Sequence, residues 1–387
     1  MVKAIKVMLI PNNVQKTKMF QYAGASRFAY NWALAREIEN YEKGGKFISD
    51  AELRKEFTKL RHSDEYAWLL GISNNVTKQA IKDACTAYKN FFKGLQKFPR
   101  FKSKKRSMPK FYQDNIKIQF SNTHVKFEGF SSSRKRNKQK LNWVRLAEHG
   151  CIPTDAKYMN PRISFDGLNW WISVCVEFPD CIEKLNDDGI GIDLGIKDLA
   201  ICSDGAKYKN LNKSQKVKKL EKQKRRLQRS ISRSYEKNKK GKSYCKTNNV
   251  IKKEKLLLKR NHRLTNIRKN YLNQTTSEIV SRKPRFICIE DLNVSGMMKN
   301  RHLSKAVQNQ GFFEFRKQLE HKCSDKGIQL IVADRFYPSS KLCSCCGNIK
   351  KDLKLSDRIY KCDCGNVIDS DFQASINLKA YGERFAS

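Results

Sequence analysis

The spacing of apolar residues divides the first part of the chain into an opening strand and a long helical block. VKAIKVMLI (2–10) alternates apolar and polar positions, which predicts a β-strand. Apolar residues then recur at helical intervals in SRFAYNWALAREIENY (26–41), and SNNVTKQAIKDACTAYKNFF (73–92) begins with residues that favour a helix N-cap. The pattern therefore predicts helices over residues 16–96.

Strand-like patterns return between residues 97 and 180. KFPRFKSKKRS (97–107) predicts a basic connector interrupted by proline. Asp166-Gly167-Leu168 separates two apolar runs and predicts a β-hairpin. The strand-like segments are IKIQF, HVKFEGF, WVRLAEH, RISF and NWWISVCVEF. The helical block is therefore either inserted into a β-rich domain or joined in tandem to an unrelated one.

The second half of the chain combines buried strands with helices. GIGIDLGIKDLAICSDG (189–205) predicts two strands joined by a tight turn, and RFICIEDL (285–292) predicts a buried strand. GFFEFRKQLEHKCSDKG (311–327) predicts an amphipathic helix, and DFQASINLKAYG (371–382) has helical spacing. Residues 213–269 predict two further amphipathic helices with a break near NKKGKSYCKTNN. We expect an α/β arrangement here.

The charge of the chain narrows the class of partner. The sequence has 79 Lys and Arg residues against 38 Asp and Glu residues, a formal net charge of +41. Residues 213–269 contain 23 basic and 3 acidic residues, so the segment has too few acids to form ion pairs with its basic side chains. A compact fold with this charge needs a polyanion, and nucleic acid is the usual one. An acidic membrane surface and a merely solvated face are the alternatives.

The sequence favours a soluble protein of the cytoplasm. No apolar run approaches the roughly 20 residues that span a bilayer. The opening segment MVKAIKVMLI lacks the apolar core and the cleavage site of a signal peptide. In that compartment the 13 cysteines are expected to be thiols or metal ligands rather than a disulfide framework.

Five cysteines cluster between residues 343 and 364. Cys343-x-x-Cys346 and Cys362-x-Cys364 are each followed by glycine, and 15 residues separate the two pairs. Two such turns can present four thiolates in the tetrahedral arrangement of a structural zinc site. The second pair is one residue shorter than the commonest spacing, and Cys345 is a spare thiol. We predict Zn²⁺ bound by Cys343, Cys346, Cys362 and Cys364, with a group of buried cysteines as the alternative.

Three carboxylates lie at the ends of predicted elements. Asp193 follows GIGI, Glu290 ends FICIE and Asp371 opens the last helix. Acids from different elements can converge at one end of a sheet, where they repel one another unless a cation lies among them. Two Mg²⁺ ions can activate water and stabilise the leaving oxygen of a phosphodiester. Taken singly, each acid is more simply a helix cap or an ion-pair partner.

Several segments together resemble the transposon-encoded TnpB family. These segments are GIDLGIKDLAICSDG, FICIEDLNVSGMM, NQGFFEFRKQLEHKC, DRFYPSSKLCSCCG and CDCGNVIDSDFQASINL. RFAYNWALA, FPRFKSKKRS and WVRL in the first half are also similar to that family. The resemblance covers nearly the whole chain. The family consists of RNA-guided DNA nucleases with a split RuvC domain, related to the compact type V CRISPR effectors.

The resemblance implies a multidomain α+β fold. An N-terminal β-barrel, the OB-like wedge domain, would span residues 1–15 and 97–180. A helical recognition domain, residues 16–96, would be inserted into it. A RuvC-like nuclease domain with an RNase H-like α/β fold would span residues 185–340 and 366–387. A zinc ribbon that binds the target would occupy residues 341–365.

The resemblance also implies roles for individual residues. Asp193, Glu290 and Asp371 match the catalytic acids that hold Mg²⁺ in the family, and Asp369 would be a neighbour without a metal bond. This chain departs from the family motif around the third acid. The departures are Ser370 for Arg, Gln373 for Asn and Ser375 for Ala.

The resemblance implies a DNA endonuclease guided by RNA. Its partners would be a guide RNA and double-stranded target DNA, with no membrane, and we expect a monomer in a prokaryotic, nucleoid-associated setting. The alternatives on the same fold are a catalytically idle RNA-guided repressor and a compact CRISPR effector. A transposase that performs strand transfer and a plain zinc-ribbon nucleic-acid binder are further alternatives.

Overall fold

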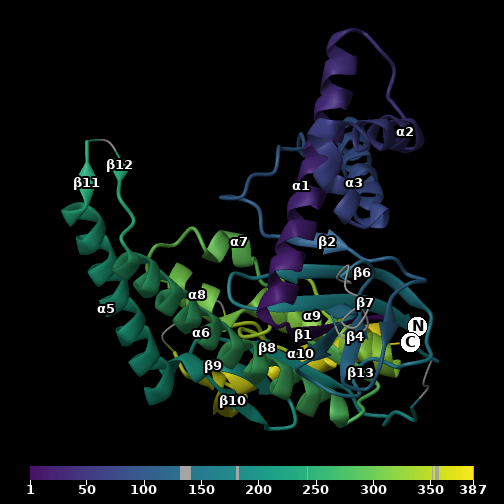
Figure 1. Ribbon diagram of the computed structural model, residues 1–387. Helices are drawn as coiled ribbons and strands as arrows, with labels where there is room; N and C mark the ends of the chain where they lie inside the picture. Colours follow the sequence, from purple (N-terminus) through teal and green to yellow (C-terminus); the bar gives the residue numbers. More distant parts are fainter. Residues whose placement is uncertain (131–140, 180–182, 242, 351, 354–356, 387) are drawn as a thin grey trace. The chain divides into compact units, whose positions relative to one another are not determined.

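The chain forms two compact units, Met1–Pro179 and Asp180–Ser387. The structure is a computed structural model (Figure 1), and it describes residues 1–130, 141–179, 183–241, 243–350, 352–353 and 357–386. In the described part of the chain, no helix is both long enough and apolar enough to cross a membrane.

The first unit is built on a 7-stranded antiparallel sheet with the order β2-β6-β7-β1-β5-β4-β3. The predicted opening strand is confirmed as β1, whose Lys3 pairs with Val176 of β7. The predicted hairpin is confirmed as β6 and β7, joined by Asp166–Asn169. The strands are β1 (Val2–Ile10), β2 (Lys110–Tyr112), β3 (Gln119–Phe120), β4 (His124–Lys126), β5 (Trp143–Leu146), β6 (Tyr158–Phe165) and β7 (Trp170–Glu177).

The expected closed barrel is wrong for the described residues, because the end strands β2 and β3 do not pair with each other. In the described residues β2 pairs with β6 and β3 pairs with β4, and no ladder joins β2 to β3. The segment IKIQF begins as a turn, since Asp114 Oδ1 accepts hydrogen bonds from the backbone N–H groups of Ile116 (3.0 Å) and Lys117 (3.1 Å). The open end is bridged by a side chain instead, because Gln113 Oε1 accepts from the Glu128 N–H at 3.0 Å.

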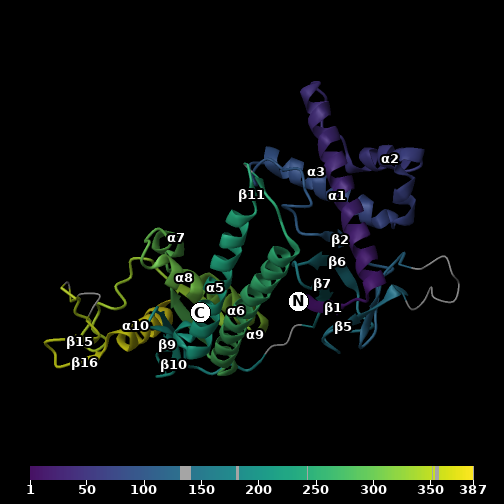
Figure 2. The ribbon, with the colours of Figure 1, turned by 60° about the vertical axis from the view of Figure 1, so that its left-hand side comes forward.

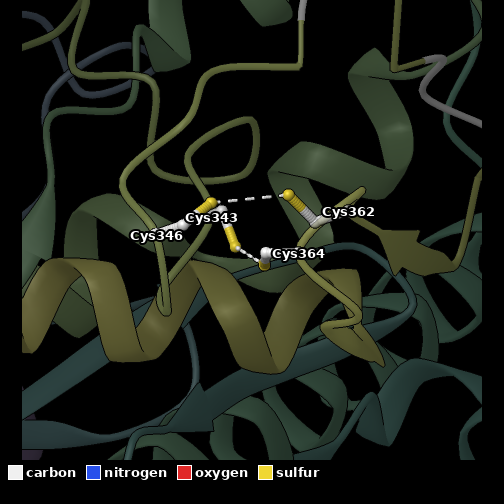
Figure 3. A group of neighbouring side chains, drawn as sticks. All are labelled: Cys343, Cys346, Cys362 and Cys364. Carbon is white, nitrogen blue, oxygen red and sulfur yellow. Dashed lines mark hydrogen bonds between the residues drawn. The ribbon is translucent and has the colours of Figure 1, made fainter.

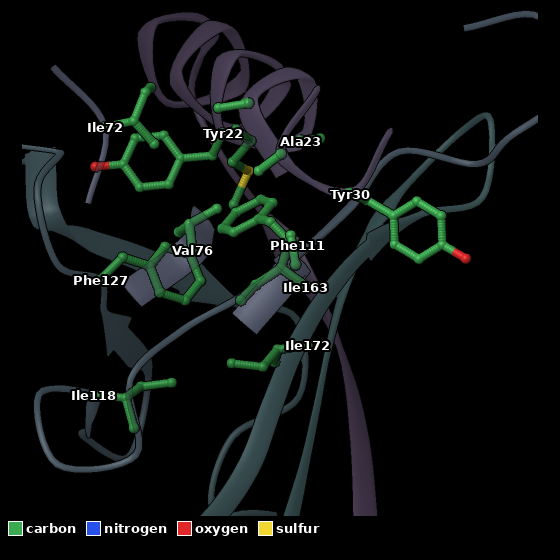
Figure 4. Packing of buried hydrophobic residues seen from close by; sticks show 14 of the residues in the cluster. Tyr22, Ala23, Tyr30, Ile72, Val76, Phe111, Ile118, Phe127, Ile163 and Ile172 are labelled. Atoms are coloured by element: carbon green, nitrogen blue, oxygen red, sulfur yellow. The ribbon is translucent and has the colours of Figure 1, made fainter. Parts of the chain in front are cut away.

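The helices of the first unit interrupt the chain between two strands of this sheet, β1 and β2, which favours insertion over a tandem arrangement. Ser73 is the N-cap of α3, as its sequence predicts. Tyr22 and Ala23 of α1 share one core with Val76 of α3 and with the sheet (Figure 4). The elements are α1 (Asn13–Glu42), α2 (Asp50–Leu60), the 3₁₀ helix η1 (Asp64–Gly71) and α3 (Asn74–Phe92).

The second unit contains a 5-stranded sheet with the order β10-β9-β8-β13-β14. Strands β10, β9 and β8 are antiparallel, whereas β8, β13 and β14 run parallel. The predicted strand–turn–strand over 189–205 is confirmed as β8 and β9. The strands are β8 (Ile190–Leu194), β9 (Asp198–Cys202), β10 (Lys207–Lys209), β13 (Phe286–Glu290) and β14 (Gln329–Ala333).

The two predicted basic helices are confirmed as α5 (Gln215–Lys237) and α6 (Asn248–Ser281), which lie side by side as a hairpin (Figure 2). The short strands β11 (Lys239–Lys240) and β12 (Ser243–Tyr244) pair at its turn. The other helices are η3 (Leu211–Lys213), α7 (Val294–Met297), α8 (Ser304–Gln310), α9 (Phe312–Lys326) and α10 (Ser370–Phe385). A small ribbon of β15 (Ile359–Lys361) and β16 (Val367–Asp369) leads into α10.

Candidate active site and metal centre

Asp193 and Glu290 lie on neighbouring parallel strands. Ile192 of β8 is in register with Ile289 of β13, so the two acids follow at the next position of each strand. Their carboxyl groups are hydrogen-bonded to each other. The backbone N–H of Leu194 also donates to Glu290 Oε1, at 3.4 Å. The sheet therefore brings the first two predicted acids into direct contact.

Burial and mutual repulsion shift the pKa values of this pair. Burial, and then the charge of Glu290, hold the pKa of Asp193 well above its ordinary value. Burial also raises the pKa of Glu290, although hydrogen bonds from Asp193 and the Leu194 N–H oppose that shift. Two carboxyl groups this close can both ionise only if a cation compensates the charge.

Asp371 approaches the pair from α10. Its charge raises the pKa of both Asp193 and Glu290, and the charge of Asp369 also raises that of Asp193, so the three predicted acids and Asp369 lie in one electrostatic cluster. Asp371 Oδ2 lies 3.7 Å from Arg358 Nη1. Helix α10 reaches this position because Gly191 has no side chain. A Cβ atom there would lie 2.1 Å from the Ser375 carbonyl oxygen.

Asp369 has a different role in the structure from Asp371. It is the N-cap of α10, and its Oδ1 accepts hydrogen bonds from the backbone N–H groups of Asp371 (3.1 Å) and Phe372 (3.0 Å). A carboxylate at this position also interacts favourably with the positive end of the helix dipole. Asp369 thus anchors the turn that presents Asp371.

A cavity of about 220 Å³ opens beside Glu290. Arg316 and Arg335 line it, and both form ion pairs with Asp291. Phe313, which is 70% exposed, forms part of the same wall. The cavity therefore offers cationic side chains next to the carboxylates, which suits an anionic group such as a phosphodiester.

A partly buried polar network behind the acids was not predicted from the sequence. Gln310, at the end of α8, donates from Nε2 to the Gly195 carbonyl (2.8 Å) and accepts at Oε1 from Asn212 Nδ2 (3.1 Å). Arg268 of α6 donates from Nε to Asn212 Oδ1 (2.8 Å) and from Nη2 to Glu221 Oε1 (2.9 Å). The only sequence signal is NQG before a helix, in which Gly311 adopts a left-handed φ of 72°.

The four predicted zinc ligands lie together in the structure (Figure 3). The sulfur atoms are 3.6 Å apart in the pairs Cys343–Cys364 and Cys346–Cys362, and all four lie within 4.8 Å of one another. This matches the roughly 3.8 Å between thiolates of a tetrahedral site with Zn–S bonds of about 2.3 Å. The cluster could hold a metal ion, and Cys345 is exposed and outside it.

The glycine after each cysteine pair permits the turn. Gly347 and Gly365 have φ values of 73° and 90°. Their N–H groups donate to the carbonyls of Cys343 and Cys362, both at 3.0 Å. Both glycines thus have the left-handed backbone conformation that glycine adopts most readily.

The cysteine loop is hydrogen-bonded to the helix that carries Asp371. Gln373 Nε2 donates to the Leu342 carbonyl at 2.9 Å, and its Oε1 accepts from Asn366 Nδ2 at 2.9 Å. Asn377 Nδ2 donates to the same Leu342 carbonyl at 2.7 Å. Gln373 and Asn377 are both buried. Gln373, a departure from the family motif, is therefore an integral contact between the cysteine loop and α10.

Three family models match the chain. Residues 173–301 match a family of the IS605 OrfB type described as "Probable transposase". Residues 312–378, which include the four cysteines and Asp371, match "Cas12f1-like, TNB domain". Residues 1–46 match a "Helix-turn-helix domain", but here they form strand β1 and the single long helix α1.

Curated relatives match along almost the whole chain. "Putative RNA-guided DNA endonuclease InsQ" of Escherichia coli (strain K12) is 30% identical, over 98% of this chain and 92% of its own length. "Putative RNA-guided DNA endonuclease" of Streptomyces pristinaespiralis is 28% identical, over 98% of this chain and 89% of its own length. A solved structure, "Cryo-EM structure of the Cas12f1-sgRNA-target DNA complex", is similar in fold, with a TM-score of 0.59, 12% identity and 98% coverage of both chains.

Proposed function

The chain belongs to the TnpB family of transposon-encoded RNA-guided DNA nucleases, and from that premise we propose that it cuts target DNA with Asp193, Glu290 and Asp371 as its catalytic residues. One observation carries the proposal: these three acids, from β8, β13 and α10, form a single electrostatic cluster. The order of the sheet, three antiparallel strands followed by two parallel ones, agrees with the RNase H-like fold of a RuvC domain.

The donor set fits Mg²⁺. Hard carboxylate oxygens are the ligands this ion prefers, and the raised pKa values of Asp193 and Glu290 describe a pair whose full ionisation needs a cation. Asp193, Glu290 and Asp371 would hold the metal. A bound Mg²⁺ pair supplies activation of water and stabilisation of the leaving oxygen. Arg316 and Arg335, in the neighbouring cavity, bind and orient the phosphodiester.

The partners are a guide RNA and double-stranded DNA. The α5–α6 hairpin presents most of the 23 basic residues of 213–269, and it has few acidic partners of its own. Base pairing between guide and target reads the sequence, while the protein reads a short adjacent DNA motif and the shape of the heteroduplex. The protein acts on DNA in the cytoplasm of its prokaryotic host.

The cysteine cluster holds Zn²⁺ in a structural role. Four thiolates and no open position are typical of such a site. Through Gln373 and Asn377 the loaded cluster braces α10, and thereby Asp371, while its outer face contacts the target. We assign residues 341–365 to this zinc ribbon, and residues 185–340 and 366–387 to the nuclease domain. The open sheet of 1–15 and 97–180 takes the place of the wedge domain, and residues 16–96 form the recognition domain.

The test begins with the protein purified from cells that carry its native locus. Any co-purified RNA is sequenced, and the complex is offered a plasmid that matches the guide, with Mg²⁺. We expect bound RNA whose affinity falls steeply with salt. The logarithm of the binding constant should fall against the logarithm of the salt concentration with a slope of roughly −0.9 per duplex phosphate contact. We also expect cleavage of the matched plasmid. Protein that holds no RNA at moderate salt contradicts the proposal.

The idle repressor is a second candidate because of the departures at Ser370, Gln373 and Ser375. A complex that binds the matched plasmid tightly, but does not cut it whichever divalent metal ion is supplied, supports that candidate. The buried hydrogen bonds of Gln373 favour the active enzyme, since they hold α10 in place.

A further inference from the structure

A cavity of about 320 Å³ lies in the helical part of the first unit, away from every residue used above. It lies between the end of α1, the loop that follows it and the end of α3. Four aromatic side chains, which we call the aromatic cage, line it: Tyr41, Phe47, Tyr88 and Phe92. Tyr88 is buried, whereas Tyr41 and Phe92 are 60% and 53% exposed. Exposed aromatic rings around a hollow can stack on a planar ligand.

Glu37 lines the same cavity and is 1% exposed. Its Oε2 accepts a hydrogen bond from the Ile48 N–H at 3.3 Å, whereas its buried Oε1 has no hydrogen-bond partner among the described residues. Burial raises the pKa of Glu37, against the opposing effects of the Ile48 N–H, the Cys85 thiol and Lys89. A buried carboxylate oxygen without a donor destabilises a fold, which argues that a ligand supplies the donor.

Lysine side chains lie around the cavity, and the charge of Glu42 at the end of α1 also reaches its Tyr88 wall. Lys46 lines it, and Lys89 Nζ lies 4.4 Å from the centre of the Phe47 ring. Lys43, just beyond α1, pairs with Glu39 outside the cavity. The ligand must therefore offer hydrogen-bond donors to a deep acid while carrying negative charge near the surface. An ammonium or guanidinium group satisfies the first condition but is repelled by the lysines.

We propose that the aromatic cage and Glu37 bind an unstacked guanine base of a single-stranded RNA segment. Guanine presents two adjacent donors, N1–H and the N2 amino group, on its Watson–Crick edge, and both can reach one carboxylate oxygen. Adenine and cytosine place an acceptor beside their amino group, and uracil flanks its single N–H with two carbonyls. Stacking on aromatic side chains is how proteins commonly hold splayed-out RNA bases, and Lys46 and Lys89 are placed to meet the adjoining phosphates.

The inference rests on the proposed function only for the source of the base, since a protein that works with a guide RNA meets single-stranded RNA. The assay is binding, not cleavage, so its failure is distinct from failure of the nuclease proposal. The full chain, freed of nucleic acid, is titrated with two short oligouridylates that differ only in a central guanine or adenine. Salt is raised until the plain oligouridylate binds weakly, and the corresponding DNA oligomers form a parallel arm.

We expect the guanine RNA to bind about tenfold more tightly than the adenine RNA, the effect of a hydrogen bond to a charged acceptor. Glu37→Gln should abolish that preference. The amide N–H groups of glutamine would face the N–H groups of guanine, and two donors cannot form a hydrogen bond with each other. Phe47→Ala should weaken the binding of both RNAs. The matched control is Glu42→Gln, an exposed acid of the same helix, which should leave the preference unchanged.

Thermal unfolding provides the second readout. Glu37→Gln should unfold at the same or a higher temperature than the original chain, because it removes a buried charge with an unpartnered oxygen. A clear loss of stability together with an intact guanine preference would mean that Glu37 is structural and overturn the proposal. Equal affinity of the original chain for the two RNAs, a preference confined to the DNA arm, or loss of the preference in Glu42→Gln would overturn it as well.

Discussion

The side chain of Gln310 donates a hydrogen bond from Nε2 to the backbone carbonyl of Gly195, at 2.8 Å, two residues beyond Asp193. The same side chain accepts from Asn212, which is held in turn by Arg268 of the basic hairpin. A partly buried path of hydrogen bonds therefore joins the helix proposed to bind nucleic acid to the turn that follows the proposed first catalytic acid. Gln310 is a positioning residue in this arrangement, since it acts through the backbone of that turn.

Replacing Gln310 by alanine should slow cleavage by about 10- to 100-fold, because a misplaced catalytic group costs up to about that much. The Gly195 carbonyl and Asn212 would lose a buried partner, which destabilises the fold by roughly 1–3 kcal/mol. Binding of RNA and target DNA should be nearly unchanged. Single-turnover cleavage rates and binding affinities, measured side by side, separate the two effects.

The matched control for Gln310 is Gln308→Ala on the same helix, whose side chain is exposed. It should cut at the original rate. Gln310→Glu keeps the acceptor for Asn212 but loses the donor for Gly195, so it should remain slow. A normal cleavage rate in Gln310→Ala would show that the turn keeps its position without this bond.

Alanine at Asp193, Glu290 or Asp371 should abolish cleavage and leave binding of RNA and target largely intact, because the basic residues that carry binding lie elsewhere. Asp369→Ala should be milder. Loss of its N-cap destabilises α10 by about 1 kcal/mol, but Asp371 remains available. The measurement is cleavage of a guide-matched plasmid with Mg²⁺ alongside a binding assay. An inactive Asp369→Ala beside a fully active Asp371→Ala would exchange the roles of these two acids.

The chain should hold one tightly bound zinc ion. Cys362→Ser should lose the metal because it removes one of the four clustered thiols, whereas Cys345→Ser should keep it because Cys345 lies outside the cluster. Removal of the metal should also slow cleavage, since Gln373 and Asn377 connect the cysteine loop to the helix of Asp371. Elemental analysis of each variant is the measurement. Loss of zinc in Cys345→Ser alone would reassign the ligands.

Lys102 should make folding stability depend on pH. Burial, and then the charge of Lys110, lower its pKa to about 7, whereas the pKa of an unfolded lysine is about 10.4. Between these values the unfolded chain binds more protons, so the contribution of Lys102 to stability increases as the pH rises from about 7 to about 10. Lys102→Met should therefore raise the unfolding temperature near pH 7, and this gain should shrink toward pH 10.

The control for Lys102 is Lys104→Met, an exposed lysine of the same connector, which should change the unfolding temperature little at either pH. The backbone of Lys102 is held by the Asn31 side chain, which donates to its carbonyl and accepts from its N–H, both at 2.8 Å. The substitution therefore keeps these two hydrogen bonds of the connector, although it also removes the contact of Lys102 Nζ with the Tyr30 ring. If Lys102→Met raised the unfolding temperature equally at pH 7 and pH 10, a lowered pKa of Lys102 would not be the cause of the effect.

Features that depend on near neighbours along the chain could be predicted from the amino-acid sequence. Ser73 could be read as an N-cap because capping involves only the next few residues. The spacing of Cys343 and Cys346 predicted half of a metal site, because a turn of such short length can present its two thiols in only a few ways. The charge of 213–269 indicated a nucleic-acid surface because it depends on composition alone.

Features that depend on residues distant in the sequence became visible only in the folded chain. Asp193 meets Glu290 only because β8 and β13 pair in one register, and Asp371 joins them only because Gly191 lets α10 come close. The barrel expected from the family is open in the described residues, because β2 pairs with β6 and β3 with β4 but not with each other. Gln310 has only the signal of NQG before a helix and Glu37 has none, since a buried amide or carboxylate is defined by what the fold places around it. Periodicity and spacing record local preferences, whereas long-range pairing depends on which surfaces bury the most area together.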